Sequence, residues 1–321
     1  MANTVGRLGW AGIAIEGTAG TYTTPADFIN YTANNLIGKH TPFGDIQAYG
    51  VREKDFSSAV GKQWGEGDIT ANLAPITAGY FFRLATNVET KTTVSGSVTD
   101  HVFTVSGTNT PTTASITFDK GAYREKFVYA CLKDFEIDVK DGLATIKAGF
   151  LSQMPTTTTS GTNTPAAETL LSFKDLVVQF GANITAAASA SGTSILSMNL
   201  KYNPNLETIY TSGSNQPSAF ACKAVETTGE YDILLNSVTE RDNYYNLTKQ
   251  AAIFTFTGAT ISGAYTEQVK IKIYNFRVND QPIETGIDNL FAYKSNFVAE
   301  YSASDSKEVD FTVRNSKTTV Y

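Results

Sequence analysis

The sequence is short of the residues that most often carry catalysis or cross-link a fold. Its 321 residues include only two cysteines, Cys131 and Cys222, and two histidines, His40 and His101. Two cysteines make no disulfide framework. The opening MANTVGRLGWAGIAIEG has a single Arg and no continuous apolar stretch, so we expect no secretory signal and reduced thiols. Two histidines also leave little material for acid–base chemistry near neutral pH.

Long apolar runs and an excess of positive charge are missing as well. No segment approaches the roughly 18 consecutive apolar residues of a membrane-spanning helix. Basic residues are outnumbered, because 25 Lys and Arg stand against 31 Asp and Glu, a net charge of −6. Wrapping of nucleic acid requires clustered Lys and Arg that neutralise phosphates. The sequence therefore argues against a membrane protein and against tight nucleic-acid binding, while its 41% of apolar residues supports a real core.

Motifs of known reactions are absent too. GTAGT at 17–21 lacks the lysine and the following helix of a P-loop, and the sequence contains neither a G-x-S-x-G elbow nor a Cys/His set with metal-ligand spacing. Acidic neighbours such as Glu136 and Asp138 could be imagined as a general acid and base. Because they alternate along a strand pattern, a solvated charged face is the better interpretation. We predict no enzymatic activity, no cofactor and no metal site.

What the sequence does contain is β-structure, and its clearest element is a hairpin at 131–151. Apolar and charged residues alternate on both sides of Asp141-Gly142, a pair that suits a two-residue turn. Folding back about this turn brings apolar residues opposite one another: Val139 with Ala144, Ile137 with Ile146 and Phe135 with Ala148. On the other face Glu136 lands opposite Lys147, a favourable cross-strand pair.

Further strands are predicted on both sides of the hairpin. They are expected at 8–16, 64–73, 102–105, 115–118, 170–180, 194–202 and 220–226. Pro75 opens a helix at 75–87, in which Ile76, Tyr80 and Leu84 recur on one face that packs on a sheet.

Four stretches read as irregular connections. Residues 21–50 are rich in Gly and Asn and are expected to form an arm or a long loop. The polar stretch 51–63 is either a solvated loop or a docking loop. MPTTTTSGTNTPAAE at 154–168 has the low complexity of a linker. The Ala- and Ser-rich segment 181–192 is expected to separate two strands.

An internal repeat indicates that the chain is duplicated. GEGDITANLAPITAGYF at 65–81 and GEYDILLNSVTERDNYY at 229–245 match at a constant offset of 164, and both read as a strand running into a helix. The second helix is expected at 237–249. Further along, KDFEIDV at 133–139 has its counterpart in YNFRVND at 274–280, in the same order. Two matches in the same order favour a duplicated domain over chance.

Three segments together resemble the tail tube, or major tail, proteins of tailed bacteriophages. The opening GIAIEGTAGTYTTPADFINYT is similar to the Gly-rich first strand and Gly-Thr turn of that family. GKQWGEGDITANLAPITAGYFFRLAT is similar to its Gly-rich strand and helix. The close FVAEYSASDSKEVDFTVRNSKTTVY is similar to its last strands.

The resemblance implies a mainly β fold and a structural role in the virion. Single-domain members of the family form six-subunit rings that stack into the tube through which the genome passes. For this chain we expect two tandem tail-tube-type β-sandwich domains, each with one short helix, at 1–153 and 169–321, with 154–168 as the linker. Three copies would then make a pseudo-hexameric ring, and a homohexamer with the second half as an outer decoration is the alternative.

The expected partners are further copies of the chain and other tail proteins: the tape measure, the tail terminator and the distal tail protein. DNA is expected only in passage, and assembly is expected in the host cytoplasm. A β-sandwich surface adhesin or a virion decoration protein is the alternative from another class.

Two sets of site residues follow from this interpretation. Rings are expected to stack through the loop at about 40–63 and through the terminal arms. The candidate ring-stacking residues, which alternate in charge, are Arg52, Glu53, Lys54 and Asp55. The channel wall is expected to be neutral to acidic, so that DNA slides without sticking, with the helices outside the inner barrel. The candidate lumen-facing acidic residues are Asp134, Glu136, Asp138 and Asp232.

Overall fold

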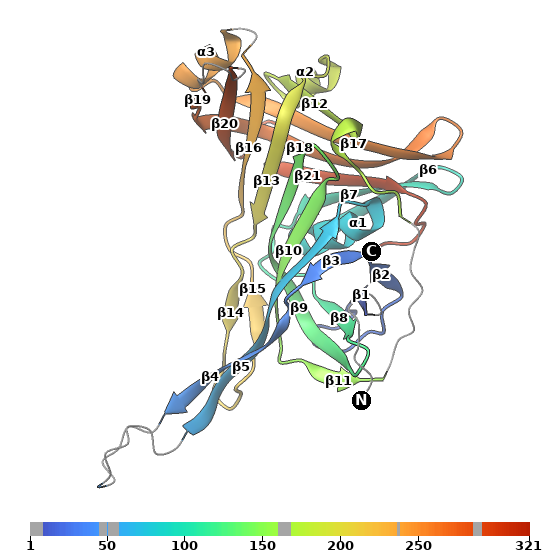
Figure 1. Ribbon diagram of the computed structural model, residues 1–321, viewed down its shortest axis with the longest axis vertical. Coiled ribbons are helices and arrows are strands. Elements are labelled where there is room, and N and C mark those ends of the chain that lie inside the picture. The colour runs from blue at the N-terminus through green and yellow to red at the C-terminus, as the bar shows by residue number, and fades with distance from the viewer. Residues whose placement is uncertain (1–8, 45–49, 51–57, 160–167, 236–237, 285–290) are drawn as a thin grey trace.

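The computed structural model describes residues 9–44, 50, 58–159, 168–235, 238–284 and 291–321, and its architecture is mainly β (Figure 1). The elements of the first half are β1 (Trp10–Ile15), β2 (Asp27–Ile29), β3 (Tyr31–Asn34), β4 (Ile37–Gly44), β5 (Ser58–Asn72), α1 (Pro75–Thr86), β6 (Asn87–Ser95), β7 (Val98–Val105), β8 (Ala114–Asp119), β9 (Arg124–Lys140), β10 (Thr145–Ser152) and β11 (Thr156–Thr158). Those of the second half are the 3-10 helix η2 (Phe173–Asp175), β12 (Leu176–Gly181), α2 (Ile184–Ser189), β13 (Ile195–Asn203), β14 (Glu207–Ile209), β15 (Ala219–Ala221), β16 (Glu226–Leu234), α3 (Thr239–Tyr245), β17 (Gln250–Ser262), β18 (Tyr265–Asp280), β19 (Ile283–Glu284), β20 (Ala292–Ala299) and β21 (Val309–Asn315). In the part of the chain that these ranges cover, no helix is long and apolar enough to cross a membrane.

The predicted hairpin is confirmed as β9 and β10. Ile146 lies opposite Ile137 and Ala148 opposite Phe135, and all four side chains are buried. Asp141 has a φ of 52°, the positive value that the turn requires. The hairpin supplies the two central strands of the sheet that runs through the first half.

Two stretches expected to be irregular in the first half contain strands. Residues 21–50 were expected to be an arm or a loop, yet β2, β3 and β4 lie there, and the C-terminal part of 51–63 belongs to β5. The prediction failed because β4 is an edge strand that carries Pro42 and polar residues. Its pairing with β5, and not its own apolar pattern, makes it a strand.

The linker and the soft stretch also contain regular structure. In the linker, β11 pairs with the start of β9. In the soft stretch, α2 begins after Asn183, whose side chain accepts a hydrogen bond from the amide of Ala186, and it buries Ala187 against β17. Short polar or Ala-rich elements of this kind form because they pack on a neighbouring strand. The local sequence pattern does not reveal that neighbour.

Helix α1 occupies the interior between the two halves of the chain. Pro75 stands at its first turn, and Asn87 ends it in the left-handed conformation. The sequence predicted one apolar face, but nearly every residue of the helix is buried. The reason is the second half: Phe311 of β21 stacks on Phe82 with ring centroids 4.6 Å apart, and Tyr202 of β13 donates a hydrogen bond to the carbonyl of Ala85 at 3.1 Å.

The two halves repeat the same antiparallel strand pairings in the same order. The equivalent pairs, first half then second, are β1–β8 and β12–β17, β8–β9 and β17–β18, β9–β10 and β18–β20, β10–β5 and β20–β16, β5–β4 and β16–β13, and β9–β11 and β18–β21. Both α1 and α3 follow equivalent strands, β5 and β16. Within the described ranges, hairpin β6–β7 and helix α2 have no counterpart in the other half.

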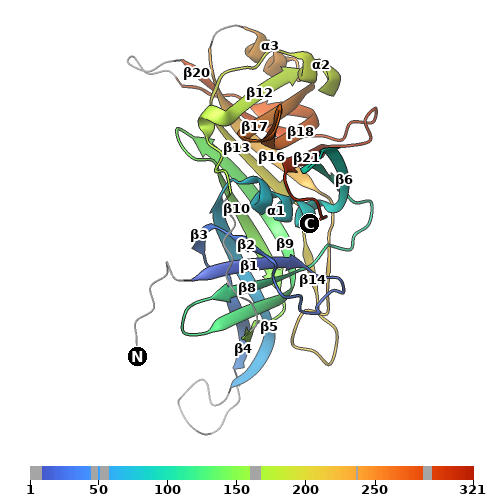
Figure 2. The ribbon, with the colours of Figure 1, turned by 90° about the vertical axis from the view of Figure 1, so that its right-hand side faces the viewer.

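The halves are joined edge to edge. β13 pairs with the edge of β9 that β10 leaves free, from Ser197 opposite Lys140 to Tyr202 opposite Phe135. A single sheet therefore runs from β4 and β5 through β10, β9, β13 and β16 to β20, and one hydrophobic core contains residues of both halves (Figures 1 and 2).

The last residues fold back onto α1. Tyr321 is only 7% exposed, and its hydroxyl donates a hydrogen bond to the carbonyl of Pro75 at 3.3 Å. Its ring fits against Gly79, where an added Cβ would lie 2.1 Å from the Tyr321 Cζ. Apolar burial therefore holds Tyr321 in the core, while residues 318–320 before it are exposed, and the stacking role expected for this end stays a prediction. The N-terminal arm, residues 1–8, lies outside the described residues.

Candidate functional site

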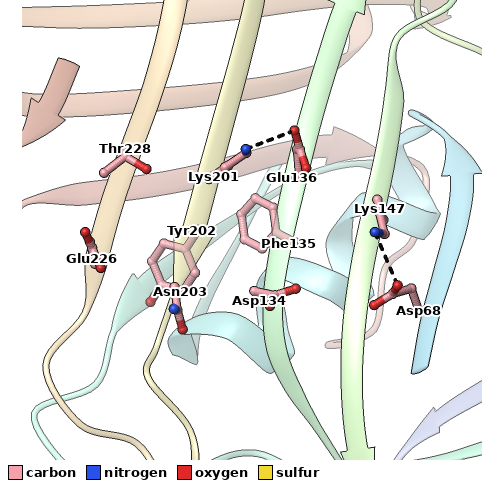
Figure 3. Close-up of a pocket in the computed structure, with 10 residues that line it drawn as sticks. All are labelled: Asp68, Asp134, Phe135, Glu136, Lys147, Lys201, Tyr202, Asn203, Glu226 and Thr228. Carbon is pink, nitrogen blue, oxygen red and sulfur yellow. Dashed lines mark ion pairs between the residues drawn. The ribbon is translucent and has the colours of Figure 1, made fainter. Parts of the chain in front are cut away.

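One face of the continuous sheet is covered with charged and polar side chains, and we call it the charged face. It is the side of β5, β10, β9, β13, β16 and β20 that points away from α1, which lies behind these strands in Figure 3. Because side chains alternate along each strand, its residues follow every second position. The groove in its centre is lined by Asp68, Asp134, Phe135, Glu136, Lys147, Lys201, Tyr202, Asn203, Glu226 and Thr228.

Opposite charges are interleaved across the strands of this face. One row, read strand by strand, contains Thr70, Lys147, Glu136, Lys201, Thr228 and Val298. The ion pairs join Lys147 Nζ to Asp68 Oδ2 at 3.2 Å, Lys201 Nζ to Glu136 Oε1 at 3.6 Å, and Lys294 Nζ to Glu230 Oε1 at 3.4 Å. Glu136 does lie opposite Lys147 as predicted, but each of the two charges pairs with a different strand. These side chains are partly exposed, so each pair contributes about 0–1 kcal/mol to stability.

The four acidic residues predicted for the channel wall all lie on the charged face. Asp134, Glu136 and Asp138 follow one another on β9, and Asn199 of β13 donates hydrogen bonds to Glu136 at 2.5 Å and to Asp138 at 3.5 Å. Asp232 of β16 accepts a hydrogen bond from Ser197 Oγ at 2.6 Å. Burial raises the pKa of Asp134, because the charged carboxylate loses water.

Sequence reasoning placed Lys147 on this face but missed its other two paired lysines, Lys201 and Lys294. Lys147, Lys201 and Lys294 stand on three different strands, and their side chains are 52%, 59% and 41% exposed. Alternation within 194–202 could have placed Lys201 on the polar side of its strand. Which acidic residue it meets depends on the β9–β13 pairing, which links residues far apart in the sequence.

A second candidate surface is the hairpin of β4 and β5, which we call the first arm. It extends away from the body of the molecule at the lower left of Figure 1. Three apolar side chains on it are exposed: Ile37 at 49%, Phe43 at 59% and Val60 at 62%. The proposed stacking residues Arg52, Glu53, Lys54 and Asp55 belong to the connection between the two strands and lie outside the described residues.

The hairpin of β14 and β15, the second arm, lies beside the first. The side-chain amide of Asn215 donates a hydrogen bond to Gln63 Oε1 at 2.8 Å, and the ammonium of Lys62 lies 4.5 Å from the ring centroid of Tyr210. The second arm lies between β13 and β16 in the chain. The first arm is formed by β4 and β5, the equivalents of β13 and β16, so each half carries one arm at the equivalent place.

One carboxylate at the base of the first arm, that of Glu66, contacts a tryptophan and two lysines. The Trp64 indole donates a hydrogen bond to Glu66 at 3.0 Å, and the ammonium groups of Lys39 and Lys133 lie 3.1 and 3.3 Å from the Glu66 oxygens. The hydrogen bond from Trp64, followed by those from the two lysines, lowers the pKa of Glu66 to about 2. The depressed pKa means that this contact stabilises the fold above the ordinary pKa of 4.5 and is lost as the pH falls through about 2.

We expect the fluorescence of Trp64 to report this titration. In a Trp10→Phe background, emission should stay constant as the pH falls from neutral to about 3 and change only near 2, because Glu66 keeps its charge. The Glu66→Gln variant, which accepts one hydrogen bond without a charge, should lack the transition. A midpoint near 4.5, the ordinary value, would contradict the assignment.

Two strand edges of the sheet are open at opposite ends. Among the described residues, 277–280 of β18 pair only with β20, and β3 and β4 pair only with β5. Unpaired edges present rows of free N–H and C=O groups that normally recruit another strand. Their presence at both ends of one sheet is typical of a subunit that polymerises.

The remaining reactive residues serve the fold. His101 is buried, with Nδ1 2.7 Å from Glu89 and Nε2 2.9 Å from the carbonyl of Lys317, and both cysteines are free. Over the described ranges, no group of three His, Cys, Asp or Glu side chains is placed to hold a metal ion.

The repeated strand pairings, open edges and projecting arms are the features of a mainly β protein with a structural role. The family model for phage tail tube proteins matches residues 7–302, nearly the whole chain. The protein therefore belongs to the phage tail tube protein family, whose members are structural components of the virion. A comparison with curated proteins finds no match.

Proposed function

We propose that this protein is the repeating subunit of a tail tube, in which rings of three chains stack into a hollow channel that delivers DNA. Each chain supplies two equivalent modules, residues 1–153 and 169–321, joined by 154–168. Three chains then fill the six module positions that the resemblance to single-domain tube proteins implies. The tube is part of the virion and assembles in the host cytoplasm.

The observation that carries this proposal is the contact between the two halves. β13 adds to the free edge of β9, and the equivalents of these strands are β3–β4 and β18. Both equivalents have open edges. A second copy can therefore place its β3–β4 edge on β18 and repeat the contact that already exists inside the chain. Such a head-to-tail contact closes into a ring when its rotation divides the circle.

The same observation weighs against the alternatives. If the second half were an outer decoration, only strands of the first half would form the sheet proposed to line the tube. Instead, β13 and β16 of the second half extend that sheet. An adhesin or a decoration protein would have no use for two complementary open edges at opposite ends. The duplicated pairings favour six modules from three chains over six chains.

We assign the charged face to the channel wall and the helices to the outer side. DNA slides when the wall offers no uncompensated positive charge, because free Lys or Arg would bind phosphates. Lys147, Lys201 and Lys294 each lie within 3.6 Å of a carboxylate oxygen, so their charge is compensated in place.

Stacking between rings is assigned to the arms. The first arm continues β5, the second arm lies between β13 and β16 in the chain, and all three strands belong to the proposed channel wall. The alternating charges of Arg52, Glu53, Lys54 and Asp55 suit a contact whose register must be fixed. The ends of the tube would meet the tape measure, the tail terminator and the distal tail protein.

The experiment that tests the proposal is a cross-section of purified tubes by cryo-electron microscopy. We expect three 321-residue chains per ring and six similar modules around the channel. Six identical chains per ring would refute the trimer, and discrete particles in place of tubes would refute the tube.

A further inference from the structure

The two equivalent helices of the chain have very different surroundings. Helix α1 follows β5 and is buried on nearly all sides, whereas α3 follows the equivalent strand β16 and has no buried residue. Five apolar side chains on and around α3 are exposed, and we call them the α3 patch: Leu235 (38% exposed), Val238 (57%), Tyr245 (71%), Leu247 (56%) and Phe291 (54%). Large exposed apolar clusters of this kind mark interaction sites.

The cover of α1 identifies what is missing over α3. Three side chains from beyond the first half lie on α1: Phe311 stacks on Phe82, Tyr202 bonds the Ala85 carbonyl, and Tyr321 bonds the Pro75 carbonyl. Without the second half, the Phe82 ring and the carbonyls of Ala85 and Pro75 would lose these contacts. The difference between the helices is therefore positional, since a following module covers the first helix and none covers the second.

We propose that the α3 patch is an interface that docks on the first half of the next copy of this chain in the ring. In the chain itself, α1 is covered by elements that include β21 and β13, whose equivalents in a first half are β11 and β3–β4. When the next copy places its β3–β4 on the edge of β18, its β11 and β3–β4 come to lie over α3, as β21 and β13 lie over α1 within one chain. The inference depends on the proposed ring and names a second contact in it, made by side chains and separate from the strand edge.

A second copy fits better than an unrelated partner because a contact of this kind already exists once within the chain, between α1 and the second half. The second half covers α1 of the first half. Only a first half from another copy can cover α3 in the same way. The patch and the open edge of β18 also lie on the same module, so one neighbour can occupy both.

The accessibility of a cysteine at Tyr245 tests the docking. The Tyr245→Cys variant should react quickly with a maleimide in the isolated subunit and about tenfold or more slowly in tubes, because labelling then requires the interface to open. The matched control is Val88→Cys, where the side chain is 38% exposed; it lies on β6, which has no equivalent among the described strands of the second half. It should label at the same rate in both states, and the unsubstituted protein gives the background of Cys222.

Assembly provides the second readout. The double variant Tyr245→Asp, Leu247→Asp should stay folded and form no tubes, whereas Val88→Asp should form them normally. Cryo-electron microscopy of wild-type tubes should place α3 against the first half of the adjacent chain in the same ring. Equal labelling of Tyr245→Cys in tubes and subunits, or α3 facing solvent or another ring, would overturn the inference. If the wild-type protein formed no tubes at all, the proposed function itself would fail.

Discussion

Replacing Asn279 by proline should abolish tube formation and leave the subunit folded. Asn279 is exposed on β18 at a register shift, so it has no cross-strand partner in β20. Proline lacks the backbone N–H and is incompatible with a strand that is paired on both edges. The isolated subunit uses only one edge here, whereas the proposed ring uses both. Blocking one position per chain interrupts every contact around the ring, which makes the expected loss complete.

The control for this prediction is Asn279→Ala, which removes the side chain and keeps the N–H. It should form tubes of normal appearance in negative-stain images. The far-UV circular dichroism and the thermal transition of Asn279→Pro should remain close to those of the wild type. Tubes formed by the folded proline variant would show that the edge of β18 is not a ring contact.

Removing the Tyr321 side chain should strongly destabilise the subunit. Tyr321→Ala deletes a buried ring that packs against Tyr80 and His101, with centroids 5.0 Å away in both cases. It also leaves Asn315, which bonds the Tyr321 hydroxyl at 2.5 Å, without its partner. Large-to-small substitutions of buried aromatic residues lower the free energy of unfolding by about 3–5 kcal/mol, because a cavity adds to the lost burial.

Chemical denaturation of the isolated subunit measures this loss. Tyr301→Ala is the matched control, because Tyr301 is 63% exposed and its removal should change the free energy of unfolding by less than about 0.5 kcal/mol. Gly79→Ala should also destabilise the protein, since its Cβ would collide with the Tyr321 ring. In the Gly79→Ala background, Tyr321→Ala should lower the free energy of unfolding by less than it does in the wild type, because both substitutions affect the same contact. Equal midpoints for Tyr321→Ala and Tyr301→Ala would contradict the role assigned to Tyr321.

The charged face was only half predictable from the sequence. Strand alternation is a local property, so it correctly placed Asp134, Glu136 and Asp138 on one side of their strand. The lysines that compensate them come from other strands, and a local pattern says nothing about which strand lies beside which. The same limit explains why β4 and β11 were assigned to loops: each is a strand only because a stronger strand offers it an edge.

The sequence by itself determined the β class and the hairpin at 131–151, because alternation and turn residues are local properties, and its matching segments predicted a two-fold repetition. Only the tertiary structure decided that the two halves share one sheet through β9 and β13, that α1 is covered while α3 is not, and that Tyr321 closes the core. These features depend on contacts between residues far apart in the sequence, such as Phe135 with Tyr202. Such contacts depend on how all the elements pack together into one core, and no single stretch of the sequence contains that information.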